Sequence, residues 1–173
     1  MRGGHPGARF GHRPAKVLES HVRQCMTVLE PGPGMGFFTL ELARLVGCSG
    51  RVVAVDIQSR MLDGLRRRAA KAGVLGRIEA RLASPDSPGV ADLAGAVDFT
   101  LAFAMVHELP AAAPFFREVA QASKPGARLL FVEPAGTLRL RCLTQNCRRL
   151  ATQDSSLRHH HPCAATTPRC SKG

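Results

Sequence analysis

The chain of 173 residues contains no tryptophan and no tyrosine. Nucleic-acid-binding surfaces that stack bases rely on aromatic side chains, so this composition argues against such a surface. No apolar run approaches the roughly 20 residues that a membrane-spanning helix needs. The first residues, Met-Arg-Gly-Gly-His-Pro-Gly, lack the apolar stretch of a secretory signal, and we therefore expect a cytoplasmic protein.

Acidic residues are scarce beside basic ones, with 13 Asp and Glu against 24 Lys and Arg, which gives a formal net charge of +11. Residues 1–135 carry 17 basic and 12 acidic side chains, whereas residues 136–173 carry 7 and 1. Four of the six cysteines also lie in the last stretch: Cys142, Cys147, Cys163 and Cys170. The composition predicts a disordered N-terminus (1–12), one folded core (13–135) and a basic tail (136–173).

The tail has few large apolar residues, so it cannot bury enough surface to offset the entropy of ordering. Disorder is predicted there, apart from a weakly alternating stretch at Leu138–Leu143. The spacing of its cysteines around His159-His-His-Pro-Cys163 fits a zinc site only loosely, and we assign no metal. Its charge makes it a candidate for nonspecific, salt-sensitive contact with RNA or DNA.

A glycine-rich turn between two apolar runs is the most informative feature. The first run, Met26–Leu29, is followed by Glu30, and glycine then occupies every second position: Gly32, Gly34 and Gly36. Glycine lets a backbone turn sharply and approach a ligand with no Cβ in the way. The second run ends at Asp56, twenty positions after the last glycine, where a carboxylate can accept hydrogen bonds from both ribose hydroxyls. The pattern predicts a site for the adenosyl part of a cofactor.

The spacing in this turn separates two classes of cofactor. A dinucleotide-binding turn reads G-x-G-x-x-G, and its third small residue brings the helix N-terminus close to a pyrophosphate. That position is Phe37 or Thr39 here, depending on the glycine from which counting starts. Glu30 would repel a pyrophosphate but attract an ammonium or a sulfonium. The sequence therefore favours S-adenosylmethionine over NAD, the alternative being a glycine-rich turn in some other α/β protein.

Apolar runs alternate with helical patterns through the core. Strands are expected over 26–29, 52–55, 78–82, 97–103 and 128–132, and helices over about 14–23, 37–46, 61–69 and 114–122. The strands read as continuous apolar runs, which predicts a parallel sheet covered on both faces. Ligand-binding residues should then lie at the carboxyl ends of the strands.

These features resemble a class I S-adenosylmethionine-dependent methyltransferase of the small methyltransferase-domain type, over about 13–134. The segments that carry the resemblance are Val28-Leu-Glu-Pro-Gly-Pro-Gly-Met-Gly-Phe37, Val53-Ala-Val-Asp56, Val97–Glu108 and Ser123–Pro134. The resemblance implies an α/β, Rossmann-like, doubly wound and mainly parallel sheet of about five strands. It also implies S-adenosylmethionine as the cofactor and a methyl acceptor that the sequence does not identify.

The resemblance carries roles onto particular residues. Those that would surround the methionine portion are Glu30, Gly32, Gly34 and Gly36. Asp56 would hold the ribose, and Ile57 would pack on the adenine. Ser84 or a neighbour stands where the family often has an acid that reads the adenine amino group, with Asp86 two positions further on. Phe103 would border the site of methyl transfer.

His107 and Glu108 are the candidate catalytic residues. A histidine near the sulfonium can take a proton from a nucleophile, because its pKa is near neutral. Methyl transfer often needs little more than alignment of the reacting atoms. The alternative is a loop histidine that caps a helix or lines the pocket.

The chain departs from the family after about residue 135. The family's last two strands, which include an antiparallel hairpin, are expected to be missing or altered, as in a truncated product or a shifted reading frame. The strand at Leu129–Val132 would then lie at or near a sheet edge and favour self-association. The rival function is that of a catalytically impaired methyltransferase fold acting as a basic nucleic-acid-binding or interaction module.

Overall fold

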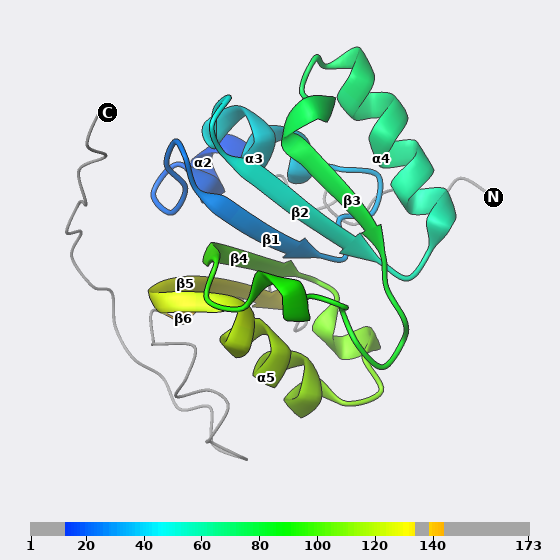
Figure 1. Cartoon of the computed structure of the whole chain (residues 1–173), viewed down its shortest axis with the longest axis vertical. Coiled ribbons are helices and arrows are strands. Elements are labelled where there is room, and N and C mark those ends of the chain that lie inside the picture. The colour runs from blue at the N-terminus through cyan, green and yellow to red at the C-terminus, as the bar shows by residue number, and fades with distance from the viewer. Residues whose placement is uncertain (1–12, 134–138, 144–173) are drawn as a thin grey trace.

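The computed structural model describes residues 13–133 and 139–143 (Figure 1). Residues 1–12 lie outside these ranges, and so does the tail apart from residues 139–143. The expectations for the N-terminus, for the tail cysteines and histidines beyond residue 143 and for nucleic-acid contact by the tail therefore fall outside the described residues. No helix within the described ranges is long and apolar enough to cross a membrane.

The core is a six-stranded sheet with the order β3-β2-β1-β4-β5-β6. The strands are β1 (Thr27–Pro31), β2 (Arg51–Asp56), β3 (Ile78–Leu82), β4 (Val97–Phe103), β5 (Ser123–Glu133) and β6 (Arg139–Leu143). β1 to β5 pair in parallel, and β6 runs antiparallel to β5. The predicted Rossmann-like sheet of five parallel strands is confirmed, and its strand order reverses between β1 and β4.

Helices cover both faces of the sheet (Figure 1). The helices are α2 (Pro14–Leu18), α3 (Thr39–Leu45), α4 (Ser59–Lys71) and α5 (Ala112–Ala122), with short 3-10 turns at η1 (Leu75–Arg77), η2 (Ala91–Leu93) and η3 (Val106–Glu108). Residues of α2, α3 and α4 share one apolar core with the sheet, and residues of η2, η3 and α5 share the other.

The strands are apolar on both faces because both faces are covered. In β2, Val52 packs into the core under α2 and α3, whereas Val53 packs into the core under α5. Both side chains are fully buried. This explains why the sequence shows continuous apolar runs rather than alternation.

The prediction that β5 lies at or near a sheet edge with unpaired backbone groups is corrected in one respect: β5 is one strand in from the edge, and its backbone groups are paired. β6 pairs along it, from Leu129 opposite Leu143 to Glu133 opposite Arg139. The weakly alternating stretch supplies this strand, because a ladder needs only extended backbone. The backbone groups expected to be unpaired on β5 are therefore paired, and among the described strands the edge on this side of the sheet is β6.

Two predicted boundaries also differ. β5 begins at Ser123 rather than at residue 128, so Lys124-Pro-Gly126 lies within the strand. The register shifts between Val97 and Phe99 on β4, and Gly126 has φ +81°, which is typical of a bulge. The first helix ends at Leu18 rather than near residue 23.

Candidate functional site

The carboxyl ends of β1, β2 and β4 open into a cavity of about 360 Å³. It lies where the strand order reverses, the usual position of the ligand in a doubly wound sheet. Seven of the eight predicted cofactor-binding residues line it: Glu30, Gly32, Gly34, Asp56, Ile57, Ser84 and Phe103. Gly36 completes the glycine turn but lies outside the lining.

The turn after β1 depends on its glycines. Gly32, Gly34 and Gly36 have φ of +71°, +52° and +84°, a region that L-residues with a Cβ rarely adopt. The Gly32 N–H donates to the Val55 carbonyl at 2.9 Å, which joins the turn to the end of β2. A Cβ on Gly32 would lie 2.8 Å from the Cβ of Met105, so Met105, two residues after β4, packs directly against the turn.

Glu30 is a buried carboxyl at the wall of the cavity. Its side chain is 3% exposed, and its Oε2 has no hydrogen-bond partner among the described residues. Burial raises the pKa of Glu30 to about 8, and the Thr39 hydroxyl, whose geometry falls short of a hydrogen bond, lowers it only in part. An unsatisfied buried carboxyl is costly, and a cationic ligand in the cavity would relieve that cost.

Asp56 ends β2, the strand that pairs with β1, and lines the same cavity. Burial raises its pKa, backbone N–H groups of Gln58, Gly34 and Ile57 oppose that rise, and the nearby charge of Glu108 adds to it. The Gln58 N–H donates to Oδ1 at 2.8 Å. The contact with Gly34 ties the carboxylate to the glycine turn, so the two predicted halves of the site are joined.

Aromatic side chains also line the cavity. Phe103 packs on Phe38 with ring centroids 4.6 Å apart, and Phe38 meets Phe37 edge-on at 5.1 Å. Ile57 is 56% exposed although it lines the cavity. An exposed branched side chain beside Asp56 offers an apolar surface to a flat ring.

Ile57→Ala should weaken binding of an adenosyl ligand by about 1 kcal/mol, because apolar contact area would be lost. Leu82→Ala is a suitable control, since Leu82 is 64% exposed and lies outside the cavity lining. Titration calorimetry with S-adenosylhomocysteine measures both. Equal affinities for the two variants would argue against contact between Ile57 and the ligand.

The segment after β3 forms another wall and is folded on itself. The Ser87 N–H donates to Ser84 Oγ at 3.2 Å, and the Gly89 N–H donates to Ser87 Oγ at 3.0 Å. Asp86 also lines the cavity, whereas the Ser84 hydroxyl is already engaged within the segment. Both residues that the sequence offers for an adenine amino group, Ser84 and Asp86, therefore lie in the cavity wall.

The candidate catalytic residues lie in η3, after β4. Glu108 lines the cavity, but His107 does not, and its side chain is 48% exposed. His107 Nε2 lies 3.9 Å from Glu108 Oε1. The structure thus places Glu108 in the cavity lining and His107 outside it.

Other cavity residues were not singled out from the sequence. They include Met61 on α4, Met105, the segment Leu109–Ala111 and Phe115 on α5. Met105 lies two residues after the end of β4, and its nearness to a strand end is a usable signal. Phe115 shows no local signal, because it reaches the cavity only through the packing of α5. No group of three or more His, Cys, Asp or Glu residues in the described part of the chain could hold a metal ion.

A sequence profile for the methyltransferase domain matches residues 28–126. The chain belongs to this methyltransferase-domain family. It is 33% identical over 115 residues to the ubiquinone/menaquinone biosynthesis C-methyltransferase UbiE of Klebsiella pneumoniae, an alignment that covers 66% of this chain and 45% of that protein. The chain therefore spans about half the length of the curated relatives that it matches.

Solved structures show the same fold. A SAM-dependent methyltransferase from Aquifex aeolicus superposes with a TM-score of 0.69 at 28% identity, over 78% of this chain and 71% of that one. A methyltransferase structure from Bacillus halodurans gives 0.62 at 22% identity, over 72% and 52% of the two chains. The family and its fold indicate S-adenosylmethionine as the cofactor.

The residues of the cavity fit this cofactor. Glu30 presents to the cavity a buried carboxyl whose Oε2 has no hydrogen-bond partner in the described part of the chain, which suits a cationic group. The glycine turn lets backbone approach the ligand, since a Cβ at Gly32 would already meet Met105. Asp56 offers a carboxylate for hydroxyl groups, and Ile57 an apolar surface for a ring.

Proposed function

We propose that this chain binds S-adenosylmethionine and transfers its methyl group to an acceptor. The observation that carries the proposal is that Glu30 and Asp56 line one cavity together with the glycine turn, whose Gly34 interacts with Asp56. The cofactor supplies an electrophilic methyl group on a sulfonium. Glu30 would neutralise its amino acid end, and Asp56 would orient it by the ribose.

The residues near the fourth strand would shape the acceptor side. Phe103 and Met105 exclude water from this wall, because both lie in the lining and contact the aromatic cluster or the glycine turn. Glu108 is the carboxylate of η3 that could receive a proton from an acceptor. His107 would act only through Glu108. Alignment alone suffices for an acceptor that is already nucleophilic.

The acceptor is an open part of the proposal. The relative named above is a C-methyltransferase of ubiquinone and menaquinone biosynthesis, so a screen should include quinol-type aromatic rings. Protein and RNA acceptors belong in the same screen, because acceptor specificity resides in loops and added segments. No contact among the described residues favours the rival nucleic-acid-binding function.

Asp56→Ala should weaken S-adenosylhomocysteine binding by about 1–3 kcal/mol, the range for lost charged hydrogen bonds. Titration calorimetry on the full chain tests this, with NAD as the competing ligand. Asp98→Ala is a matched control, because Asp98 bonds Thr27 and Lys124 and lies outside the cavity lining. Tight binding of NAD with no binding of S-adenosylhomocysteine would overturn the proposed function.

A further inference from the structure

One wall of the cavity is a long connection with no regular structure. It runs from the end of β3 to η2, and its residues from Ala83 to Pro88 all line the cavity. Connections of this length are mobile unless side chains hold them. The position of this wall, and hence the shape of the cavity, depends on what anchors the connection.

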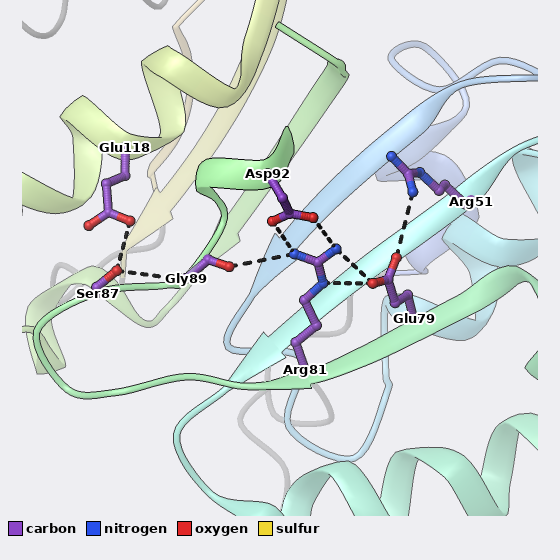
Figure 2. Close-up of polar contacts among 7 residues, drawn as sticks. All are labelled: Arg51, Glu79, Arg81, Ser87, Gly89, Asp92 and Glu118. Carbon is purple, nitrogen blue, oxygen red and sulfur yellow. Dashed lines mark hydrogen bonds and ion pairs between the residues drawn. The ribbon is translucent and has the colours of Figure 1, made fainter. Parts of the chain in front are cut away.

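An arginine on β3, the strand that precedes this connection, anchors the far end of the connection (Figure 2). Arg81 donates from Nη1 to Asp92 Oδ1 at 2.7 Å and from Nη2 to Asp92 Oδ2 at 2.8 Å. This two-pronged pair closes the connection into a loop, because Arg81 precedes it and Asp92 follows it. A planar guanidinium that meets a carboxylate with two bonds fixes both distance and orientation.

Arg81 is itself held from the sheet side. Its Nε donates to Glu79 Oε1 at 2.8 Å, and Glu79 also lies 3.7 Å from Arg51 on β2. The Arg81 side chain is only 19% exposed, which limits screening by solvent. Its guanidinium lowers the pKa of Asp92. The Arg81 guanidinium is therefore held in place by Glu79 on its own strand as well as by Asp92.

The same loop is tied to the other side of the fold at its middle. The Ser87 hydroxyl donates to Glu118 Oε2 on α5 at 2.8 Å, and Figure 2 shows this bond beside the arginine cluster. The Gly89 carbonyl lies 3.5 Å from Arg81 Nη1. Val90 and Leu93 are almost fully buried in the core under α5. Between these anchors lie the residues that face the cavity.

We infer that Arg81 is a positioning residue for the cofactor: by gripping Asp92 it holds the loop from Ser84 to Pro88 at the distance that closes the cavity on the adenosyl ligand. The inference rests on the proposed function. Arg81 does not touch the cavity, and its effect passes through the loop backbone.

The chain offers a matched pair of variants. Asp92→Asn and Glu79→Gln each remove one carboxylate partner of Arg81, but only Asp92 lies beyond the loop. Asp92→Asn should raise the dissociation constant for S-adenosylhomocysteine about fivefold, the upper range for one exposed ion pair. Glu79→Gln should leave it within about twofold, although it also breaks the pair with Arg51. Arg81→Lys should fall between wild type and Arg81→Gln, because a lysine keeps the charge and loses the fork.

A second measurement follows the loop without any ligand. Hydrogen exchange at the Ser87 and Gly89 amides, whose bonds form inside the loop, should be faster in Asp92→Asn and unchanged in Glu79→Gln. Equal changes in the two variants, or none in either, would overturn the inference while wild type still binds S-adenosylhomocysteine. Failure of wild type to bind that ligand would overturn the proposed function, and with it the cofactor role of Arg81, even if the exchange rates behave as expected.

Discussion

Glu30→Gln is expected to stabilise the cofactor-free fold at pH 8 and to weaken cofactor binding at the same pH. Glu30 is buried, and its Oε2 has no hydrogen-bond partner within the described residues. Ionising it inside the fold is costly, so glutamine removes a destabilising charge. The same charge would favour the cationic end of the cofactor, so its loss should weaken binding about 10- to 100-fold.

The sign of the pH dependence follows from the raised pKa. Burial raises the pKa of Glu30 from 4.5 to about 8 in the folded chain. Between these values the folded chain holds a proton that the unfolded chain has released, so stability falls as pH rises through this window. The glutamine variant lacks this fall. Its advantage should be near zero at pH 4.5 and reach on the order of a few kcal/mol at pH 8.

Urea unfolding at several pH values measures the stability difference. Glu41→Gln is the control, because it makes the same chemical change at a residue that pairs with Arg44 on the surface of α3. A constant difference between wild type and Glu30→Gln across the window would contradict the prediction.

Cofactor binding gives a second measurement. At pH 7 Glu30 is mostly protonated in the free site, so binding of a cationic ligand should release close to one proton. Calorimetry in two buffers of different ionisation enthalpy detects that proton, and Glu30→Gln should abolish it. A binding event with no buffer dependence in wild type would mean that Glu30 does not ionise on binding.

The features that the sequence predicted well are local. Glu30, the alternating glycines and Asp56 lie at the ends of two adjacent strands, and a parallel sheet brings such ends together whatever the rest of the chain does. The strands were visible because both faces are covered, which leaves continuous apolar runs. The predictions of the fold class and of the cofactor rest on these features alone.

The features that the sequence did not show depend on distant partners. β6 is weakly alternating, and its place is decided by the open edge of β5 rather than by its own pattern. Arg81 reads as one more basic residue until Asp92 is placed opposite it. His107 and Glu108 are neighbours in sequence and their side chains approach to 3.9 Å, yet only Glu108 lines the cavity.

Gly32→Ala is expected to destabilise the fold by about 2–5 kcal/mol and to abolish cofactor binding. Two costs combine at this position. Alanine at φ +71° is strained by about 1–2 kcal/mol. Its Cβ would also lie 2.8 Å from Met105 Cβ, so the turn or the η3 segment must move, at a cost of about 1–3 kcal/mol.

Gly73→Ala separates these costs. Gly73 follows α4 with φ +69°, and a Cβ there would meet nothing within 4 Å. It should therefore lose only the strain energy of about 1–2 kcal/mol and keep full affinity for S-adenosylhomocysteine. Thermal unfolding and calorimetry on the two variants measure both effects. Equal losses of stability, or retained binding in Gly32→Ala, would show that Met105 yields easily and that the turn does not shape the cavity. A larger loss at Gly32 together with lost binding would show instead that close packing of η3 on the glycine turn sets the cofactor site.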